Sequence, residues 1–369
     1  MQDKENGGFY GLIDYELCIN KQADKGSIAL NRFLWSFSAA YRITKNEDYL
    51  SSAHHAYHFL MNNMMDSDYD GVYWSVDYQG NPTDTRKHVY AQSFAVYALS
   101  EYYRVTQNEE ALAAAVRLYH LIEKNGYFPE RTAYGEEFTR EWVEQANEQL
   151  SENGVIADIT MNTHLHVLEA YTNLYRIYPV DALKERIVNL LTIFYEKIYD
   201  SSTHYLGVFF DKSWNRLLDL TSYGHDIEAS WLLDEAIKVI GLKDDKLDQM
   251  VIHIAYNIGK HAVLPDGSLA NEKEGDHVDE SKIWWVQVEA MIGFVNAYGH
   301  TKDEFFRERA LRMWDYVKQY LIDKREGGEW FWAVQPNGQP LGREIGGPWK
   351  AAYHNSRFCM EMIERVTEA

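Results

Sequence analysis

Three histidines of this 369-residue chain lie in stretches with helical spacing, and each shares a helix face with other polar residues. Polar side chains on the buried face of a helix are costly unless they are paired or functional. A single buried histidine is more often structural than catalytic, but three such clusters on separate segments favour a catalytic site. The clusters are Asn162, His166 and Glu169; His225 and Glu228; and His354 and Arg357.

The positions of two of these histidines predict that both are neutral bases. His225 follows Ser222 and Gly224 at an expected helix start, and His354 lies within two turns of Pro348. The positive end of a helix dipole disfavours the imidazolium form. A neutral imidazole accepts a proton near pH 7. Two such bases at one pocket are suited to removing a proton from carbon and returning it.

Arg32 lies in an otherwise apolar helical stretch, Leu30-Asn-Arg-Phe-Leu-Trp-Ser-Phe. One interpretation is that its side chain extends to solvent or pairs with a buried acid. The other is that its cation faces the pocket and stabilises a developing oxyanion. His88 and Tyr90 begin another expected helix, and Tyr90 is a candidate contact for a sugar.

A turn that combines glycine or an acidic residue with aromatic residues recurs six times along the chain. Intervals of 60 to 72 residues separate these turns, which is long enough for two helices and a connection. Six helical hairpins predict an all-α fold, a closed (α/α)6 barrel with a pocket at one mouth. The turn glycines are Gly7, Gly71, Gly135, Gly207, Gly267 and Gly327.

Twelve stretches of helical spacing agree with this interpretation. Short β-hairpins are expected in the loops at 72–78, 205–210 and 329–334, where they would surround the mouth of the pocket. No linker or change of composition divides the chain, so residues 1–369 are predicted to form a single catalytic domain. The expected helices are 30–41, 51–64, 85–104, 109–124, 136–149, 159–177, 182–198, 223–240, 247–261, 282–298, 303–321 and 350–366.

The composition narrows the classes of partner. Thirty-six basic and 56 acidic residues give a net charge of −20, which disfavours nucleic acid and anionic membranes. The N-terminus is polar, no apolar run reaches about 18 residues, and two cysteines form no disulfide framework. These features predict a cytoplasmic protein. They leave its oligomeric state open, and a monomer is compatible with them. The abundance of aromatic residues suits a carbohydrate ligand, although most must pack in the core.

Several segments together resemble the cellobiose 2-epimerases of the N-acylglucosamine 2-epimerase superfamily. The resemblance covers nearly the whole chain and implies an (α/α)6 barrel. It also implies inversion at C2 of the reducing-end glucose in β-1,4-linked disaccharides, cellobiose and lactose among them, without metal or nucleotide. The segments are Arg32 within Leu-Asn-Arg-Phe-Leu-Trp, Met161-Asn-Thr-His-Leu-His166, Ser222-Tyr-Gly-His225-Asp-Ile-Glu-Ala, Ile283-Trp-Trp-Val-Gln-Val-Glu-Ala, Asp323-Lys-Arg-Glu-Gly-Gly-Glu-Trp and Gly347-Pro-Trp-Lys-Ala-Ala-Tyr-His354-Asn.

The resemblance also implies roles for individual residues. His225 and His354 would be the acid/base pair, and His166 would assist ring opening or hold the sugar. Arg32 would stabilise an enediolate intermediate. The residues expected to line the site are Tyr90, Asn162, Glu228, Trp285 and Trp349, with His88 as a further candidate contact.

Two departures from the family pattern stand out. The family carries a further helix before the segment that begins at Asn6, whereas Met1 almost adjoins that segment here, so the ring is expected to be incompletely closed. Residues 66–71 match the first half of a calcium loop, but Asp77 replaces the usual glutamate, which favours an acidic turn. His54 and His58 lack an evident third ligand, so we predict no metal site.

Three alternatives remain open at the level of the sequence. An aldose–ketose isomerase or a monosaccharide or N-acylglucosamine 2-epimerase could use the same scaffold. A glycoside hydrolase could use Glu228 and Glu289 as its two carboxylates. A sugar-binding protein would lack turnover. The abundance of tryptophan in the C-terminal third favours a longer sugar with a second subsite, and these residues are Trp284, Trp285, Trp330, Trp332 and Trp349.

Overall fold

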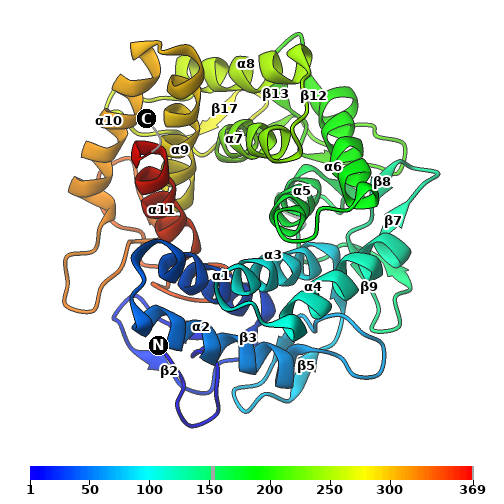
Figure 1. Ribbon diagram of the computed structural model, residues 1–369. Helices are drawn as coiled ribbons and strands as arrows, with labels where there is room; N and C mark the ends of the chain where they lie inside the picture. The colour runs from blue at the N-terminus through cyan, green and yellow to red at the C-terminus, as the bar shows by residue number, and fades with distance from the viewer. Residues whose placement is uncertain (151–153, 368–369) are drawn as a thin grey trace.

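Six inner helices form a closed ring in the computed structural model, which describes residues 1–150 and 154–367 (Figure 1). Each inner helix contacts the next one around the ring, and the last packs against the first. The inner ring is therefore closed by α1 and α11, so the expectation of an incompletely closed ring is wrong for the inner helices. The inner helices are α1 (Ser27–Thr44), α3 (Val89–Thr106), α5 (Met161–Tyr175), α7 (Tyr223–Ile240), α9 (Trp284–Thr301) and α11 (Tyr353–Thr367).

Outer helices pack behind the first five inner helices, and each follows its inner partner in the sequence (Figure 1). Four of them end in a five-residue π-helical turn: Leu60–Met64, Ile122–Gly126, Phe194–Ile198 and Val317–Leu321. None of the described helices has the length and apolar character that a membrane span requires. The outer helices are α2 (Glu47–Phe59), α4 (Glu109–Leu121), α6 (Asp181–Ile193), α8 (Asp245–His261) and α10 (Glu304–Tyr316).

Inner helices are buried on more sides than outer helices, because an outer helix has one face in water. Outer helix α4 buries one stripe that includes Ala111, Ala115 and Leu118, which is the pattern of a helix with one face in water. Inner helix α3 is buried at every position from Val89 to Tyr102, because it has neighbours on all sides. The hydrophobic core therefore fills the space between the two layers of helices.

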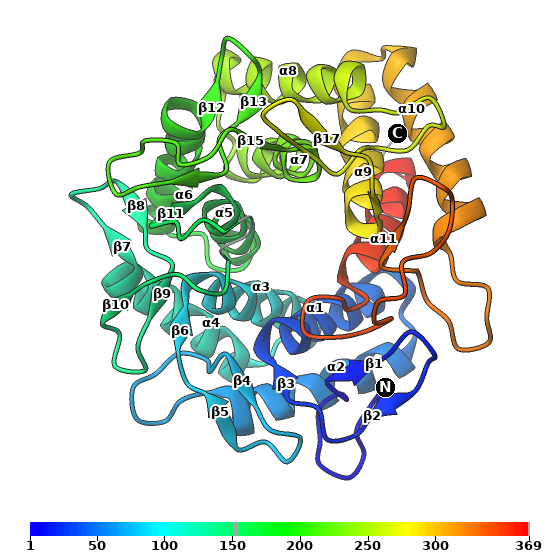
Figure 2. The ribbon, with the colours of Figure 1, turned by 180° about the vertical axis from the view of Figure 1, so that it is seen from behind.

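Short antiparallel sheets hold the starts of the inner helices. A strand runs directly into each of α1, α3, α5, α7 and α9, and it pairs with a strand from a connecting loop. Figure 2 views the ring from the side that carries these strands. The strands that precede helices are β3 (Lys25–Gly26), β6 (Lys87–His88), β11 (Ile159–Thr160), β15 (Leu220–Ser222) and β18 (Lys282–Ile283).

The remaining strands complete eight sheets of two or three strands, and each sheet is short. They are β1 (Leu12–Ile13), β2 (Ile19–Asn20), β4 (Ser75–Val76), β5 (Pro82–Asp84), β7 (Tyr127–Phe128), β8 (Ala133–Tyr134), β9 (Glu137–Phe138), β10 (Glu144–Gln145), β12 (Tyr199–Asp200), β13 (Tyr205–Leu206), β14 (Phe209–Phe210), β16 (Glu272–Glu274), β17 (His277–Asp279) and β19 (Ala333–Val334). The predicted hairpins therefore exist, but as pieces of two or three residues.

Four of the six predicted turns are confirmed, because an antiparallel residue pair encloses Gly7, Gly71, Gly267 and Gly327, whereas Gly135 and Gly207 directly follow such a pair. Gly71 and Gly267 have φ angles of 79° and 92°, a left-handed conformation that side chains other than glycine rarely adopt. The repeat is thus a structural unit. The closing pairs are Gln2 with Phe9, Met65 with Val72, Tyr127 with Tyr134, Tyr199 with Leu206, Val263 with Leu269, and Ile322 with Trp330.

The mostly helical class is confirmed, but the predicted helix over 136–149 is wrong. Strand β9 replaces it, paired with β6 on one side and β10 on the other. Glu136 accepts hydrogen bonds from the Thr160 N–H at 2.6 Å and the Thr163 hydroxyl at 2.5 Å. These tertiary contacts outweigh the helix-forming composition of the segment. The described residues therefore contain eleven α-helices instead of twelve.

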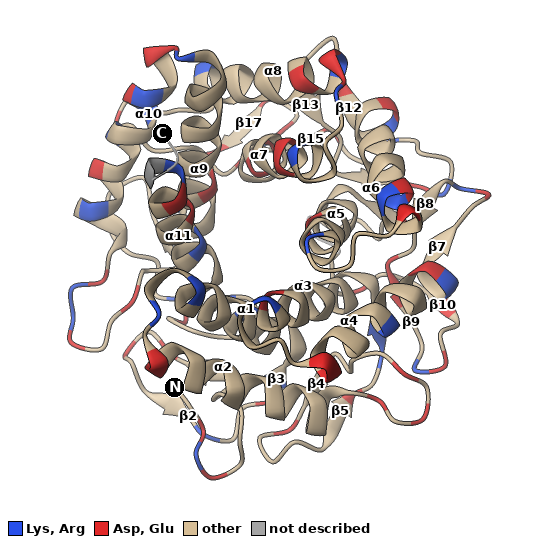
Figure 3. Ribbon diagram, in the orientation of Figure 1, with Lys and Arg blue, Asp and Glu red and all other residues tan. Residues whose placement is uncertain are grey.

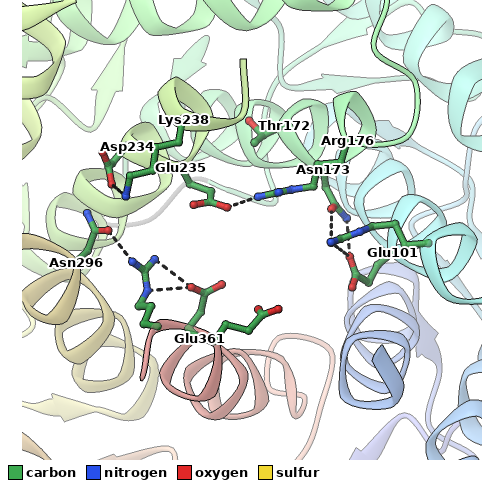
Figure 4. Close-up of polar contacts among 12 residues, drawn as sticks. Glu101, Thr172, Asn173, Arg176, Asp234, Glu235, Lys238, Asn296 and Glu361 are labelled. Carbon is green, nitrogen blue, oxygen red and sulfur yellow. Dashed lines mark hydrogen bonds and ion pairs between the residues drawn. The ribbon is translucent and has the colours of Figure 1, made fainter. Parts of the chain in front are cut away.

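Charged and polar side chains join the C-terminal ends of the inner helices, opposite the strands (Figure 4), and Figure 3 marks the charged positions along the ribbon. One contact links every neighbouring pair of inner helices, and most of these residues line a cavity of about 310 Å³. The ring is therefore closed by polar contacts at this end. The contacts, from α1 around to α1 again, are Arg42 with Glu101, Glu101 with Asn173, Arg176 with Glu235, Asp234 with His300, Asn296 with Arg365, and Glu364 with Arg42.

Replacement of Arg42 tests this polar closure. We expect Arg42→Ala to lower the free energy of unfolding by about 1–3 kcal/mol, because it removes the links from α1 to both α3 and α11 and takes one cation from the buried Glu101. Urea unfolding measures the change. The control is Arg307→Ala, which breaks an exposed pair with Glu304 and should cost less than about 1 kcal/mol. An Arg42 variant as stable as this control would contradict the role.

His164 in the first turn of α5 is a structural histidine. Its Nδ1–H donates to the Thr160 carbonyl at 2.8 Å, and its Nε2 accepts the Tyr134 N–H at 3.0 Å. The neutral ring uses both nitrogens, and burial lowers the pKa of His164 to about 4. Protonation would break the bond that ties α5 to β8.

We expect the stability advantage of the wild type over His164→Gln to fall by about 2 kcal/mol between pH 7 and pH 5. The pKa of His164 is lower in the folded protein than in the unfolded chain, so only the unfolded chain gains this proton as the pH falls. Its contribution to stability is lost between about pH 6.5 and about pH 4. Urea unfolding of both proteins at each pH measures it. His58→Gln, at an exposed position, should show no such change, and a pH-independent difference for His164 would refute the assignment.

Candidate active site

A cavity of about 260 Å³ opens at the end of the ring where the inner helices begin. Nine of the ten predicted site residues line it, and they come from all six inner helices and the loop before α11. The strands before the helices fix these starts at one level, so side chains far apart in sequence meet there. The nine are Arg32, Tyr90, Asn162, His166, His225, Glu228, Trp285, Trp349 and His354.

His354 lies at the start of α11 and is 5% exposed. Its Nδ1–H donates to Glu289 Oε1 at 2.7 Å, which leaves the unprotonated Nε2 as the nitrogen available to a substrate. Burial, together with the cations Arg32 and Arg357, lowers the pKa of His354 well below the ordinary value. The residue is therefore a neutral base at pH 7.

His225 lies in the first turn of α7. Its Nδ1 is 2.7 Å from the Ser222 hydroxyl, and burial lowers its pKa to about 3, with a smaller contribution from His166. The Trp285 ring lies 4.7 Å from the His225 ring and 5.7 Å from the His354 ring. Two neutral histidines thus contact one indole at the base of the cavity.

His166 is held by an acid of its own helix. Its Nδ1 is 2.8 Å from Glu169 Oε2. Burial alone would raise the pKa of Glu169, but Arg357, His166 and Tyr353 outweigh it and lower that pKa to about 2. Glu169 therefore stays ionised and fixes the orientation of the His166 ring.

Arg357 connects the carboxylates behind the cavity. Its fully buried guanidinium contacts Glu169 and Glu228 and lies 2.7 Å from Glu289 Oε1. Burial raises the pKa of Glu228 and of Glu289 to about 7, and Arg357 opposes that rise. One cation on α11 is thus shared by acids from α5, α7 and α9.

Arg32 has a different environment from Arg357. It is 4% exposed, donates to the Trp349 carbonyl at 2.5 Å and to the Tyr90 hydroxyl at 3.0 Å, and packs against the Phe94 and Tyr353 rings. Within the described residues no carboxylate pairs with it. The structure therefore holds an uncompensated cation at the cavity, where it can stabilise an anion.

His88 is the predicted residue that the cavity lining does not include. It is fully buried at the end of β6, where its Nδ1 accepts the Tyr90 N–H at 3.2 Å and its Nε2 is 3.2 Å from Asn147 Oδ1. Burial lowers its pKa to about 4. In this position His88 caps α3 and so orients Tyr90.

Sequence reasoning missed part of the lining. Gln149 is the last residue of the wrongly predicted helix over 136–149, and Leu150 and Arg343 carried no signal of spacing or motif. Trp284 and Trp332 were recognised only as members of a tryptophan-rich segment. Helical periodicity could not find these residues, because most of them lie in connecting loops.

One group of described residues has the spacing of metal ligands: Glu228, Glu289 and His354 offer atoms within 4.8 Å of one another. The Arg357 guanidinium already contacts both of these carboxylates, so their charge is met by a protein cation. In the predicted acidic turn a carboxylate is also paired with protein cations, because Asp66 lies 2.9 Å from Lys87 and 2.8 Å from Arg140.

Comparison with known proteins agrees with this geometry. A curated cellobiose 2-epimerase from Ruminococcus albus is 47% identical over 368 residues, which is 99% of this chain and 94% of that protein. The solved structure of a cellobiose 2-epimerase from Bacillus thermoamylovorans is 63% identical with a TM-score of 0.97, and the match covers 99% of this chain and 94% of that one. The structure of a D-mannose isomerase has a TM-score of 0.86 at 19% identity over 98% and 93% of the chains, which shows a shared fold.

The sequence model of the N-acylglucosamine 2-epimerase (GlcNAc 2-epimerase) family matches residues 7–357. This range includes all six inner helices up to Arg357, and thus every histidine of the cavity. The family predicted from the sequence motifs is confirmed. The chain belongs to the N-acylglucosamine 2-epimerase family of carbohydrate-isomerising enzymes.

Proposed function

We propose that this enzyme inverts C2 of the reducing-end glucose in β-1,4-linked disaccharides, converting cellobiose to glucosyl-mannose and lactose to epilactose. The observation that carries the proposal is that two neutral histidines and a cation without a carboxylate partner line one cavity. The names of the relatives with 47% and 63% identity support cellobiose as a substrate.

In the proposed mechanism the sugar ring opens, assisted by His166, to give an aldehyde at C1. One of His225 and His354 removes the C2 proton, and the C–H electron pair forms a C1–C2 double bond while O1 becomes an oxyanion. Arg32 stabilises this charge, as do the N-terminal ends of the inner helices. The first histidine passes its proton to solvent. The other histidine takes up a proton from solvent, which the negative charge of the enediolate favours, and then protonates C2 from the opposite face and restores the aldehyde.

The position of Trp285 supports the assignment of one proton-transfer step to His225 and the other to His354. A planar enediolate can be protonated from either face, and a single base reaches both faces only if the intermediate rotates. Bases that contact one indole from two different helices do not require that rotation. Tyr90, Asn162, Glu228 and Trp349 would hold the sugar in this scheme, and no metal or cofactor takes part.

The glycoside hydrolase alternative fits this geometry poorly. Hydrolysis needs two carboxylates on either side of the scissile bond. Glu228 and Glu289 instead share Arg357, and Glu289 also accepts hydrogen bonds from His354 and from Trp231. An aldose–ketose isomerase uses the same enediolate but returns the proton to C1, so product analysis must separate it from the proposed reaction.

We also propose that residues 1–369 form one catalytic domain of the (α/α)6 type. The closed inner ring supports this assignment, together with the five outer helices that follow their inner partners. The contacts of Arg357 across the ring favour a single cooperative unit.

Incubation with cellobiose in deuterium oxide tests the reaction. We expect NMR to show glucosyl-mannose with deuterium at C2, because the second histidine delivers a proton that it has taken from solvent. Monosaccharide products would indicate hydrolysis, and a ketose as the main product would indicate isomerisation. An epimer without deuterium at C2 would exclude the exchange that this mechanism predicts.

Replacement of the two bases tests their roles. His225→Asn and His354→Asn should each lower kcat by about 10²–10⁴-fold, the usual contribution of a general acid or base. One of them should still exchange the C2 proton of one epimer without completing the inversion. His120→Asn, at an exposed position, is the control, and thermal melting checks the fold. Near-normal turnover by both active-site variants would show that the acid/base pair is wrongly assigned.

A further inference from the structure

Three aromatic rings and one guanidinium form a row of contacts that leads from His354 toward solvent. The Trp284 ring lies 6.1 Å from the His354 ring and 4.7 Å from the Trp332 ring. The Arg343 guanidinium lies 3.7 Å from the centre of the Trp332 ring. The solvent-exposed fraction rises along this row, from 2% for Trp284 through 9% for Trp332 to 46% for the Arg343 side chain. Arg343 is thus the outermost and most exposed member of this row.

The position of Arg343 determines what the outer cavity offers a ligand. Because its guanidinium covers the face of Trp332, a ligand there meets a planar set of N–H donors instead of a bare indole. Its Nε and Nη2 face Glu344 at 3.4 and 3.2 Å, and Nη1 has no protein partner among the described residues. Arg343 lines the same cavity as four tryptophans, and a free N–H donor beside aromatic rings suits a sugar hydroxyl.

The depth of the site places the two rings of a disaccharide differently. The reacting ring must reach His354, which is 5% exposed, at the base of the cavity. The glycosidic bond at C4 then directs the other ring away from C1 and C2, toward the mouth. Arg343 lines the cavity on that outer side. A monosaccharide bound beside His354 at the base of the cavity would not reach Arg343.

We propose that Arg343 is a specificity residue that binds a hydroxyl of the non-reducing sugar and so favours disaccharides over monosaccharides. This inference rests on the proposed function, because it assumes that the reacting ring is the one near His354. The exposed pair with Glu344 orients the guanidinium but adds little stability. Removal of the Arg343 side chain should therefore change sugar selectivity and leave the fold intact.

Equilibrium binding tests this role without turnover, because four tryptophans line the cavity and report sugar binding by fluorescence. We expect Arg343→Ala to raise the Kd of cellobiose about tenfold, as for the loss of a charge-assisted hydrogen bond. The Kd of D-glucose should change less than twofold. Arg343→Lys keeps the charge but not the planar donors, and should give an intermediate loss. In the epimerisation assay, KM for cellobiose should rise while kcat stays within about twofold.

The matched control is Arg309→Ala, which removes a guanidinium stacked on the Phe305 ring of α10, outside the cavity. It should not change the Kd of either sugar. An equal increase for cellobiose and D-glucose in the Arg343 variant, or no increase for cellobiose, would overturn the proposal. If the wild type binds cellobiose but gives no epimer, the proposed reaction fails while the binding test of Arg343 still gives a result.

Discussion

The buried guanidinium of Arg357 is the contact on which both the ring and the site depend. It lies on the last inner helix and contacts acids from three others, so its charge is compensated only when α11 is docked. Two of those acids also hold catalytic candidates, Glu169 the His166 ring and Glu289 the His354 ring. Breaking a buried pair of this kind leaves an uncompensated charge, which is strongly destabilising. Stability and catalytic geometry therefore share one network.

The two ends of the ring differ in whether their basic side chains are paired with acids. At the end where the helices begin, no carboxylate of the described residues pairs with Arg32, and His225 and His354 are neutral, so positive potential is available to an anionic intermediate. At the other end, basic side chains pair with acids from neighbouring helices and meet the negative ends of the helix dipoles. The direction of the inner helices thus separates a reactive end from a closing end.

Much of the fold and the lining could be predicted because both follow periodic rules. Turns repeat at regular intervals, and polar residues such as His166 and His225 stand out on otherwise apolar helix faces. Three features could not be found this way. Residues 136–149 have helical composition, but pairing with β6 decides their structure. His88 shares the polar character of the site residues and instead caps a helix. The contacts of Arg357 span 188 and 129 residues, which no local pattern reports.

The order of the inner helices has a consequence for synthesis on the ribosome, because α11 follows the other five in the sequence. Domains fold as units as the chain emerges, and the earlier helices appear first. Until α11 emerges, Glu169, Glu228 and Glu289 face one another across an open ring without their cation. Burial of three acids without a cation is costly, so we expect this part of the earlier helices to stay hydrated until α11 docks. Docking of α11 then brings Arg357 and His354 into place together, so the three acids gain their cation in the same step in which the cavity gains His354.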